Sequence, residues 1–462
     1  MSVLALLLPL FAGSALVLAA IGWRHRGGTA LVAGEGWVIG ALLAGATTWL
    51  PGVVPAQVFA AGWPWLAGVA AAARGLAWWL RRRGASADAA APPGRRGLLW
   101  WLLLLLVLAH LLLAFRQAVL LPTVPWDAWT TWLGRARAWF GSEGFLPLVS
   151  ADHWLQAEGA VRATLAPHYP TLLSRLVVWM ASAAGAWDTG VVHLPWPALG
   201  AALAAGLYGH LRRAALAPVA AMAATFACVS LPLLSTHLSL AGYADLWVAA
   251  LVLFAFLHWI HWRRGRQPGD LVLAMALAAC LPLLKLEGAV WLSCLAAAAA
   301  WSLLPSRWQW ILPLAAMLLA GLLMAVGMLA LPLPGLGIVR LSWGEISIPA
   351  LGTLELFWRP VGAQVFASLF LLPNWNLLWL AAPLLAALHW RALADRELRG
   401  AAAFLLLAGG FLFVLFFFTD ASAWAENLTS INRLVLQVAP AVVAFLALLS
   451  AAERSGIPAR RR

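Results

Sequence analysis

The sequence predicts an all-α polytopic membrane protein, and its composition indicates this class. Of the 462 residues, 64% are hydrophobic and only 10% are charged, and the mean hydropathy is +0.88. Soluble domains carry about 25% charged residues. No polar stretch in the chain is long enough to form a soluble domain, so we expect a single integral membrane unit.

The basic residues argue against a nucleic-acid-binding protein, and the cysteines argue against a disulfide-rich or cysteine-metal protein. The formal net charge is +13, but basic residues in a membrane protein act mainly as orientation signals, so we expect no nucleic acid partner. Cys228, Cys280 and Cys294 all lie in apolar runs without paired spacing. We interpret them as packing residues and expect neither a disulfide framework nor a metal site.

Thirteen stretches come close to the length of about 20 apolar residues that a membrane span needs. In chain order they are roughly 2–23, 30–50, 54–80, 97–120, 189–211, 214–234, 243–262, 270–285, 288–304, 309–332, 374–390, 400–418 and 433–451. An odd number of crossings places the two termini on opposite sides of the membrane.

The arginines give the predicted orientation, because cytoplasmic loops are enriched in basic residues. With the amino terminus outside, 20 of the 30 basic residues fall on the cytoplasmic side. The predicted order is three leading spans over 1–80, a basic cytoplasmic linker over 81–97, a main transmembrane unit over 98–452 and a basic cytoplasmic tail over 453–462. The linker, RRRGASADAAAPPGRRG, is rich in proline, glycine and small residues.

Two outer segments, 121–188 and 333–373, are too polar for spans and too apolar for simple loops. Within the first, residues 168–187 place apolar side chains at helical spacing, which predicts a helix that lies in the membrane interface without crossing. Tryptophans such as Trp126 and Trp129 are frequent here. Anchoring at the interface is the ordinary interpretation of such rings, and contact with a sugar or a polyprenyl chain is the alternative.

Residues 124–140, VPWDAWTTWLGRARAWF, place one carboxylate directly after a predicted span. Asp127 lies between two tryptophans, and Arg135 and Arg137 follow. A solvated acid at a span end is one interpretation of Asp127. The other is a general base held among indole rings.

Lys285 and Glu287 interrupt the apolar run ACLPLLKLEGAVWL. Insertion of a charge at mid-membrane costs about 2.5–3.5 kcal/mol, so such residues are candidates for function. Lys285 is also the single lysine among the 30 basic residues. A Lys–Glu pair that closes the turn between two spans is one interpretation, and a phosphate-binding site near the outer face is the one we favour.

Two more polar positions are predicted at the outer face. Tyr243 and Asp245 lie at the start of one span, and Arg433 lies at the start of the last span. A helix cap explains Asp245, and snorkelling to the interface explains Arg433. However, both map to the same outer leaflet as Asp127, Lys285 and Glu287, and this convergence predicts a shared site.

Five motifs together resemble a known family: PWDAWTTWLGRARAWF, HYPTLL, LAGYADLWVA, LLKLEGAVWL and NRLVLQVAPAVV. Over about residues 97–452 the chain resembles bacterial glycosyltransferases with the GT-C fold, similar to the protein O-mannosyltransferase and aminoarabinose transferase group. The usual Lys-Asn-Glu-Gly element of such proteins has Leu286 at its second position here. Their His-Pro-x-Tyr-Pro element is reduced to PHYP at 167–170.

The resemblance implies transfer of a sugar from a polyprenyl-phosphate donor to an acceptor lipid, glycan or protein. The reaction would occur at the outer face of the bacterial cytoplasmic membrane, with Asp127 as general base. Lys285 and Arg433 would hold the lipid phosphate, and Arg135 or Arg137 would assist. The other predicted substrate-binding residues are Trp126, Trp129, His168, Tyr169, Tyr243, Asp245 and Glu287. The resemblance implies no certain cofactor and leaves a divalent cation open.

Two other classes are compatible with a polytopic chain. A transporter or glycolipid flippase would also have many spans and intramembrane charges, but the sequence contains no convincing internal repeat of the kind found in many transporters. A structural or assembly protein of the membrane would need none of these charges. The clustered acid and arginines of the outer segments favour the transferase.

Overall fold

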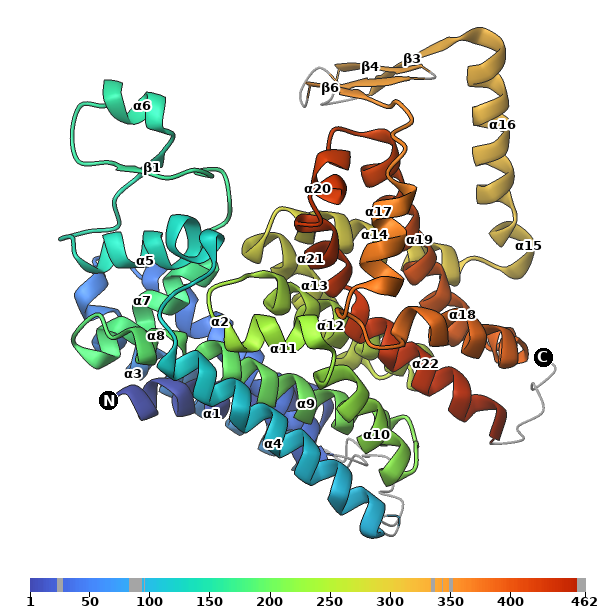
Figure 1. The fold of residues 1–462 in the computed structure, drawn as a ribbon. Coiled ribbons are helices and arrows are strands. Elements are labelled where there is room, and N and C mark those ends of the chain that lie inside the picture. Colours follow the sequence, from blue (N-terminus) through green and yellow to red (C-terminus); the bar gives the residue numbers. More distant parts are fainter. Residues whose placement is uncertain are drawn as a thin grey trace.

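The computed structural model of the protein is mostly helical (Figure 1). It describes residues 1–22, 28–82, 94, 96–333, 337–342, 344–348 and 352–454. Arg24 and Arg26, most of the predicted linker 81–97 and nearly all of the predicted tail 453–462 lie outside the described residues.

The helices differ widely in length. They are α1 (Ser2–Ile21), α2 (Gly28–Ala46), α3 (Val58–Arg82), α4 (Leu98–Leu120), α5 (Leu133–Phe140), α6 (Ala151–Gln156), α7 (Leu172–Ala184), α8 (Thr189–His193), α9 (Pro195–Arg213), α10 (Pro218–Val229), α11 (Pro232–Ser239), α12 (Asp245–Gly265), α13 (Pro268–Leu284), α14 (Glu287–Leu303), α15 (Ser306–Gln309), α16 (Ile311–Val326), α17 (Gly362–Phe366), α18 (Leu378–Leu388), α19 (Arg396–Phe418), α20 (Ser422–Glu426), α21 (Ser430–Leu436) and α22 (Ala439–Arg454).

Among the described residues, seven helices are long and apolar enough to cross a membrane. Two further pairs, α10 with α11 and α21 with α22, qualify if each bent pair is one span, with bends of 66° and 42°. The protein is therefore a multi-pass membrane protein with seven to nine candidate spans, and the predicted number of 13 is not shown. Pro232 and Pro440 stand at the starts of α11 and α22, where a missing N–H interrupts the helical hydrogen bonds.

Several predicted spans form shorter helices. The stretches 270–285 and 288–304 form α13 and α14, with 17 residues each, and 374–390 contains α18, with 11. The break between α13 and α14 lies at Lys285, whose backbone is extended. Lys285 and Glu287 interrupt the apolar run at this break, which is where one predicted span ends and the next begins.

The predicted span 309–332 is not a continuous helix. Helix α16 ends at Gly327, which adopts a positive φ of 80° that favours glycine, and the chain then enters a strand. Strands β3 (Met328–Leu333), β4 (Gly337–Ser342), β5 (Glu345–Ile348) and β6 (Gly352–Glu355) form an antiparallel sheet in chain order. The expectation of an all-α fold is corrected here. Strand β3 has no β-branched residue, but β4 and β5, with which it forms the sheet, are rich in isoleucine and valine, which favour strands.

The sheet and a loop segment extend from the same side of the helical body in Figure 1. The loop segment lies between α5 and α7 and carries α6 and a two-residue parallel pairing of β1 (Leu148–Val149) with β2 (Arg162–Ala163). These regions fall largely in the two segments that the sequence predicted as outer. The orientation of the chain in the membrane stays a prediction.

Helix α12 is the centre of the core. Nearly all of its residues are buried, and it contacts α9, α11, α13, α14, α19, α21 and α22. A helix that is apolar on all sides is buried on all sides. Asp245 at its start and Arg263 near its end are therefore buried as well, whereas Arg264 is exposed.

The leading helices pack onto this body. Helix α2 contacts α9, and α1 contacts α13. The segment 168–187 contains α7, whose 13 residues span about 20 Å and are too few to cross a bilayer core of about 30 Å. Most of α7 is buried against α1, α2, α3 and α5, and the Trp179 indole donates to the Ala5 carbonyl at 3.0 Å.

Candidate functional site

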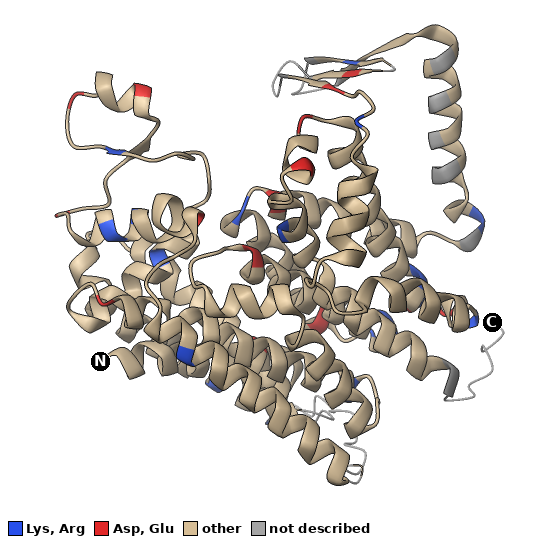
Figure 2. Ribbon diagram, viewed as in Figure 1, with Lys and Arg blue, Asp and Glu red and all other residues tan. Residues whose placement is uncertain are grey.

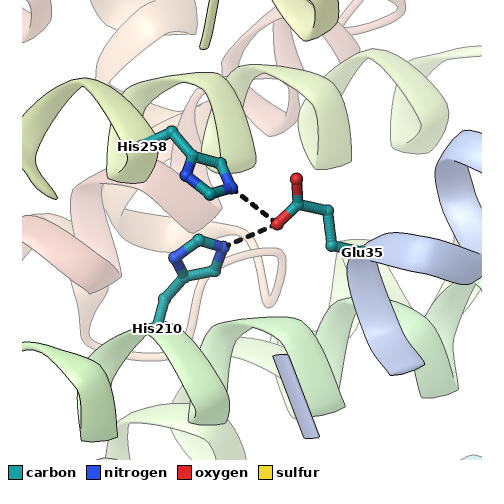
Figure 3. Close-up of side chains that lie close together, drawn as sticks. All are labelled: Glu35, His210 and His258. Atoms are coloured by element: carbon teal, nitrogen blue, oxygen red, sulfur yellow. Dashed lines mark hydrogen bonds and ion pairs between the residues drawn. The ribbon is translucent and has the colours of Figure 1, made fainter. Parts of the chain in front are cut away.

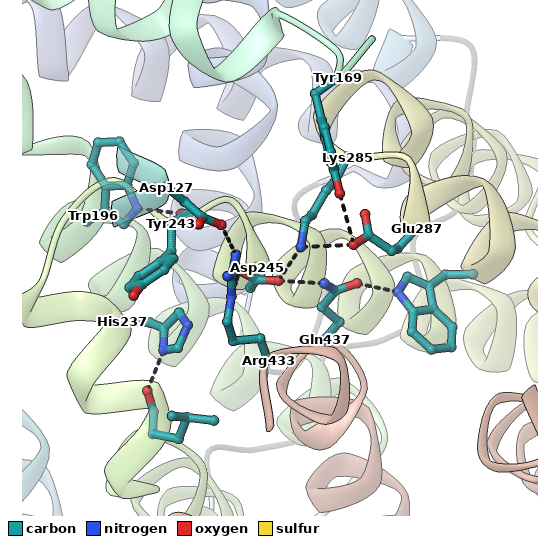
Figure 4. Close-up of polar contacts among 12 residues, drawn as sticks. Asp127, Tyr169, Trp196, His237, Tyr243, Asp245, Lys285, Glu287, Arg433 and Gln437 are labelled. Atoms are coloured by element: carbon teal, nitrogen blue, oxygen red, sulfur yellow. Dashed lines mark hydrogen bonds and ion pairs between the residues drawn. The ribbon is translucent and has the colours of Figure 1, made fainter. Parts of the chain in front are cut away.

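Charged residues are sparse in this chain (Figure 2), but five of them contact one another. We define the charge cluster as Asp127, Asp245, Lys285, Glu287 and Arg433. Asp127 follows α4, Asp245 begins α12, Lys285 and Glu287 lie at the break between α13 and α14, and Arg433 lies in α21. Figure 4 shows the side chains pointing toward one another. The predicted convergence of these residues is thus present as direct contacts.

Asp245 is the central acceptor of the charge cluster. Its side chain is fully buried and accepts from Lys285 Nζ at 2.8 Å and from Arg433 Nε at 3.0 Å. It does not cap α12, since it lies in the first turn of that helix and makes no capping hydrogen bond. Asp245 instead fixes the positions of the two cations.

Lys285 and Glu287 form the local pair that the sequence allowed. The ammonium lies 3.1 Å from Glu287 Oε1, and the Tyr169 hydroxyl donates to the same oxygen at 3.5 Å. Only 7% of the Lys285 side chain is exposed. Since Lys285 also binds Asp245, the pair is part of a larger network and does more than close a turn.

Arg433 and Asp127 form the open side of the charge cluster. Arg433 Nη2 lies 2.5 Å from Asp127 Oδ2 and 2.9 Å from Asp245 Oδ2. The Asp127 side chain is 34% exposed and the Arg433 side chain 17%. Because Arg433 forms two ion pairs, snorkelling to the membrane interface does not by itself explain its position. The exposed rings of Trp126 and Trp129, with centroids 4.6 Å apart, flank Asp127 in the sequence.

Two tyrosines line the charge cluster and remain neutral donors. The Arg433 guanidinium lies 4.7 Å from the centre of the Tyr243 ring, and the Tyr243 carbonyl accepts from Trp196 Nε1 at 2.8 Å. Burial raises the pKa of Tyr243 and of Tyr169 above the usual value of tyrosine. Both hydroxyls are therefore protonated at neutral pH, and that of Tyr169 donates to Glu287.

Three predicted residues lie outside these contacts. The buried Arg135 donates to the backbone carbonyls of Tyr169, at 3.0 Å, and of Ala166. Its described partners are thus carbonyls of the loop that carries Tyr169, so Arg135 is a positioning residue. Arg137 is exposed, and His168 is exposed with its ring beside Tyr169.

Arg135→Gln is expected to loosen the 166–170 loop, because the carbonyls that Arg135 satisfies lose their donor. The expected local cost is about 1–3 kcal/mol, measured as faster amide hydrogen exchange over 166–170. Arg137→Gln is the matched control, since this neighbouring arginine is exposed. Equal exchange in the two variants would contradict the positioning role.

Sequence reasoning missed Gln437 and Trp291. Gln437 Nε2 donates to Asp245 Oδ1 at 2.7 Å, and Trp291 Nε1 donates to Gln437 Oε1 at 2.5 Å. Gln437 lies four residues after Arg433, a spacing that places two side chains on one helix face. That spacing was a usable signal for Gln437, whereas nothing marked Trp291 among the 30 tryptophans of the chain.

The structure also contains an apolar cavity of about 850 Å³. It is lined by residues 215–231, which include α10, and by residues of α18 and α22. Trp375 lines the cavity and donates from Nε1 to Asn432 Oδ1 at 3.3 Å, directly before Arg433. One wall of the cavity is therefore linked by a hydrogen bond to the residue that precedes Arg433.

The charge cluster contains two cations and three carboxylates. Every cation already has a carboxylate partner, so an incoming anion must displace a carboxylate from Lys285 or Arg433. Asp127 is the most exposed of the three carboxylates. Among the described residues, the group of side chains spaced to hold a metal ion lies elsewhere, at Glu35, His210 and His258.

Comparisons with family models, with curated proteins and with solved structures find no match. The family resemblance of the motifs therefore stays a prediction. The number and the apolar character of the long helices show the general class of the protein. The chain is a polytopic helical membrane protein.

Proposed function

We propose that the protein is a membrane glycosyltransferase of the GT-C type that uses a polyprenyl-phosphate sugar as donor. The observation that carries the proposal is the contact of Arg433 with both Asp127 and Asp245, which couples a partly exposed acid to a buried cation site. An acid for the acceptor and cations for the leaving phosphate are the two groups that this reaction requires. The proposed place of reaction is the outer face of a bacterial cytoplasmic membrane, which the family resemblance implies, with the orientation that the arginine distribution predicts.

The proposed reaction begins with an exchange of partners at Arg433. The donor phosphate takes the guanidinium that Asp127 holds at 2.5 Å, and Asp127 is released as a proton acceptor. The acceptor oxygen or nitrogen then forms a bond to the anomeric carbon while the bond from that carbon to the phosphate oxygen breaks. The acceptor proton passes to Asp127, and polyprenyl phosphate leaves with its new negative charge beside Lys285 and Arg433.

The surroundings of Arg433 support a lipid donor. The cavity of about 850 Å³ is apolar along α10 and α22, and a polyprenyl chain needs such a surface. Asn432 connects the cavity wall at Trp375 to the position of Arg433. A chain in the cavity with its phosphate at Arg433 would not need a nucleotide-binding domain, and the sequence has no Gly-rich phosphate loop.

A glycolipid transporter or flippase is the second candidate, and the bent helix pairs favour it. Transporters commonly build substrate sites where a spanning helix is interrupted. The 42° bend between α21 and α22 lies directly after the helix that carries Arg433. Such a protein would move the intact glycolipid and would leave its bond to phosphate unbroken.

Donor binding tests the proposal at Arg433. Arg433→Ala is expected to weaken binding of a synthetic polyprenyl-phosphate sugar by about tenfold or more, since a charge-assisted contact contributes about 1.5–3 kcal/mol. Arg433→Lys should recover part of the affinity, because a point charge replaces the planar fork. The measurement is titration of the labelled lipid into protein in nanodiscs.

Arg359→Ala is the control, because Arg359 pairs with an exposed aspartate, Asp420. Unchanged lipid binding by Arg433→Ala would contradict the phosphate site. Release of polyprenyl phosphate separates the two candidate functions. A transferase releases it in the presence of a membrane extract that supplies acceptors, whereas a flippase translocates the donor without releasing it.

A further inference from the structure

A second cluster of ionisable side chains lies fully buried between the leading helices and the central helix. Figure 3 shows His210 of α9 and His258 of α12 pointing toward the carboxylate of Glu35 in α2. Glu35 Oε2 lies 3.2 Å from His210 Nε2 and 2.7 Å from His258 Nε2. His258 follows Asp245 by thirteen residues of the same helix, about 20 Å along its axis, so this group is separate from the charge cluster.

The other ring nitrogen of His258 is held by a carboxylate. His258 Nδ1 lies 2.7 Å from Asp270 Oδ1, and Arg213 donates to both Asp270 oxygens at 2.6 Å. Histidines that bind metals almost always donate their second ring N–H to a carboxylate, a carbonyl or a water in this way. When Nδ1 donates to Asp270, the Nε2 lone pair of a neutral ring faces Glu35 Oε2, and a cation between the two acceptors would relieve the conflict.

Two kinds of cation can meet this need, a second proton on His258 or a metal ion. The buried Glu35 Oε1 has no hydrogen-bond partner within the described part of the chain, and neither has the buried His261 Nε2. The His261 ring stacks on the His210 ring with centroids 5.3 Å apart. A proton on His258 would leave Glu35 Oε1 unsatisfied at a cost of about 1–3 kcal/mol, whereas a metal ion could bind this oxygen as well.

We propose that Glu35, His210 and His258 bind a divalent transition-metal ion, with zinc as the best fit. Imidazole and carboxylate are the ligands that zinc takes in His₂Glu sites, with bonds of about 2.0–2.2 Å. Such bonds place tetrahedral ligand atoms about 3.3 Å apart. The three ligand atoms all lie within 4.8 Å of one another. The 3.2 Å contact of His210 already has this spacing, and the 2.7 Å contact of His258 would lengthen by about 0.6 Å when the ion binds.

The burial of the three ligands gives the ion a structural role. None of the ligand side chains is exposed, so a substrate cannot reach the ion. Glu35 belongs to the leading helices, whereas His210 and His258 belong to the body. The ion therefore ties α2 to α9 and α12. The sequence predicted no metal site because its ligands lie on three helices far apart in the chain and show no motif spacing.

Metal content of the full chain tests this proposal directly. The protein is produced with added zinc, purified through an affinity tag without histidines and washed with EDTA before elemental analysis. We expect about one zinc ion per chain, retained because the site is closed. Cobalt added during production is expected to give the visible absorption of a tetrahedral N/O site.

Three variants locate the ion. Glu35→Gln and His258→Gln, which preserve side-chain size, are expected to lose the zinc and to unfold at a lower temperature. His153→Gln is the matched control, because His153 is exposed on α6. Zinc content far below one per wild-type chain would overturn the site and leave a metal-free ion-pair network. Unchanged zinc in folded Glu35→Gln would overturn the assignment as well.

Discussion

Asp127→Asn is expected to slow sugar transfer by about 10²–10⁴-fold, the usual contribution of a well-placed general base. Asparagine keeps the size of the side chain and cannot accept the proton. Arg433 should stay in place, because it also binds Asp245 through Nε at 3.0 Å and Nη2 at 2.9 Å. Donor binding should therefore remain at least as tight as in the wild type, since a carboxylate that competes with the phosphate has been removed.

The measurement is the initial rate of polyprenyl phosphate release from a synthetic donor, with a membrane extract as the source of lipid, glycan and protein acceptors. Asp152→Asn is the control, because this exposed aspartate lies on α6, away from the charge cluster. Near-normal release by Asp127→Asn would show that Asp127 is only a counter-ion of Arg433. Loss of donor binding together with release would indicate a structural role instead.

The contacts of the charge cluster could be predicted from the sequence, because charged residues are few in this apolar chain and their burial without a partner costs free energy. Lys285 and Arg433 each require a partner, and Asp127, Asp245 and Glu287 are among the acids at the same predicted face. The central place of Asp245 was not predictable. It depends on α12 being enclosed on all sides by helices that are distant in the sequence.

The number of spans was less accessible, because average hydropathy does not record where a helix breaks. The break at Lys285 coincides with a predicted boundary between spans, but nothing in the apolar run 309–332 indicated the positive φ of Gly327 that ends α16. Beyond Gly327 the same apolar residues form β3. Glu35 could not be identified as a site residue from the sequence either. A single acid in the predicted span 30–50 indicates a site only when the structure shows that His210 and His258 face it.

Asp245→Asn is expected to destabilise the fold more than any other single change in the charge cluster. Asp245 is fully buried and lies between the ammonium of Lys285 and the guanidinium of Arg433. Without its charge, Lys285 retains only Glu287 and Arg433 retains only Asp127. Removal of one partner from a buried ion pair costs about 3–5 kcal/mol, so the midpoint of thermal unfolding in detergent should fall clearly.

A second substitution shows whether Asp245→Asn destabilises the fold through the unpaired charge of Lys285 or through altered packing at position 245. Lys285→Met in the Asp245→Asn background removes the cation that has lost its closest partner, and it should recover part of the lost stability. Such coupling is expected between residues in contact. Asp420→Asn is the control, because Asp420 is 95% exposed in its pair with Arg359 and exposed pairs contribute little. If the double variant unfolds at a lower temperature than Asp245→Asn alone, the buried charge of Lys285 is not what makes Asp245 necessary.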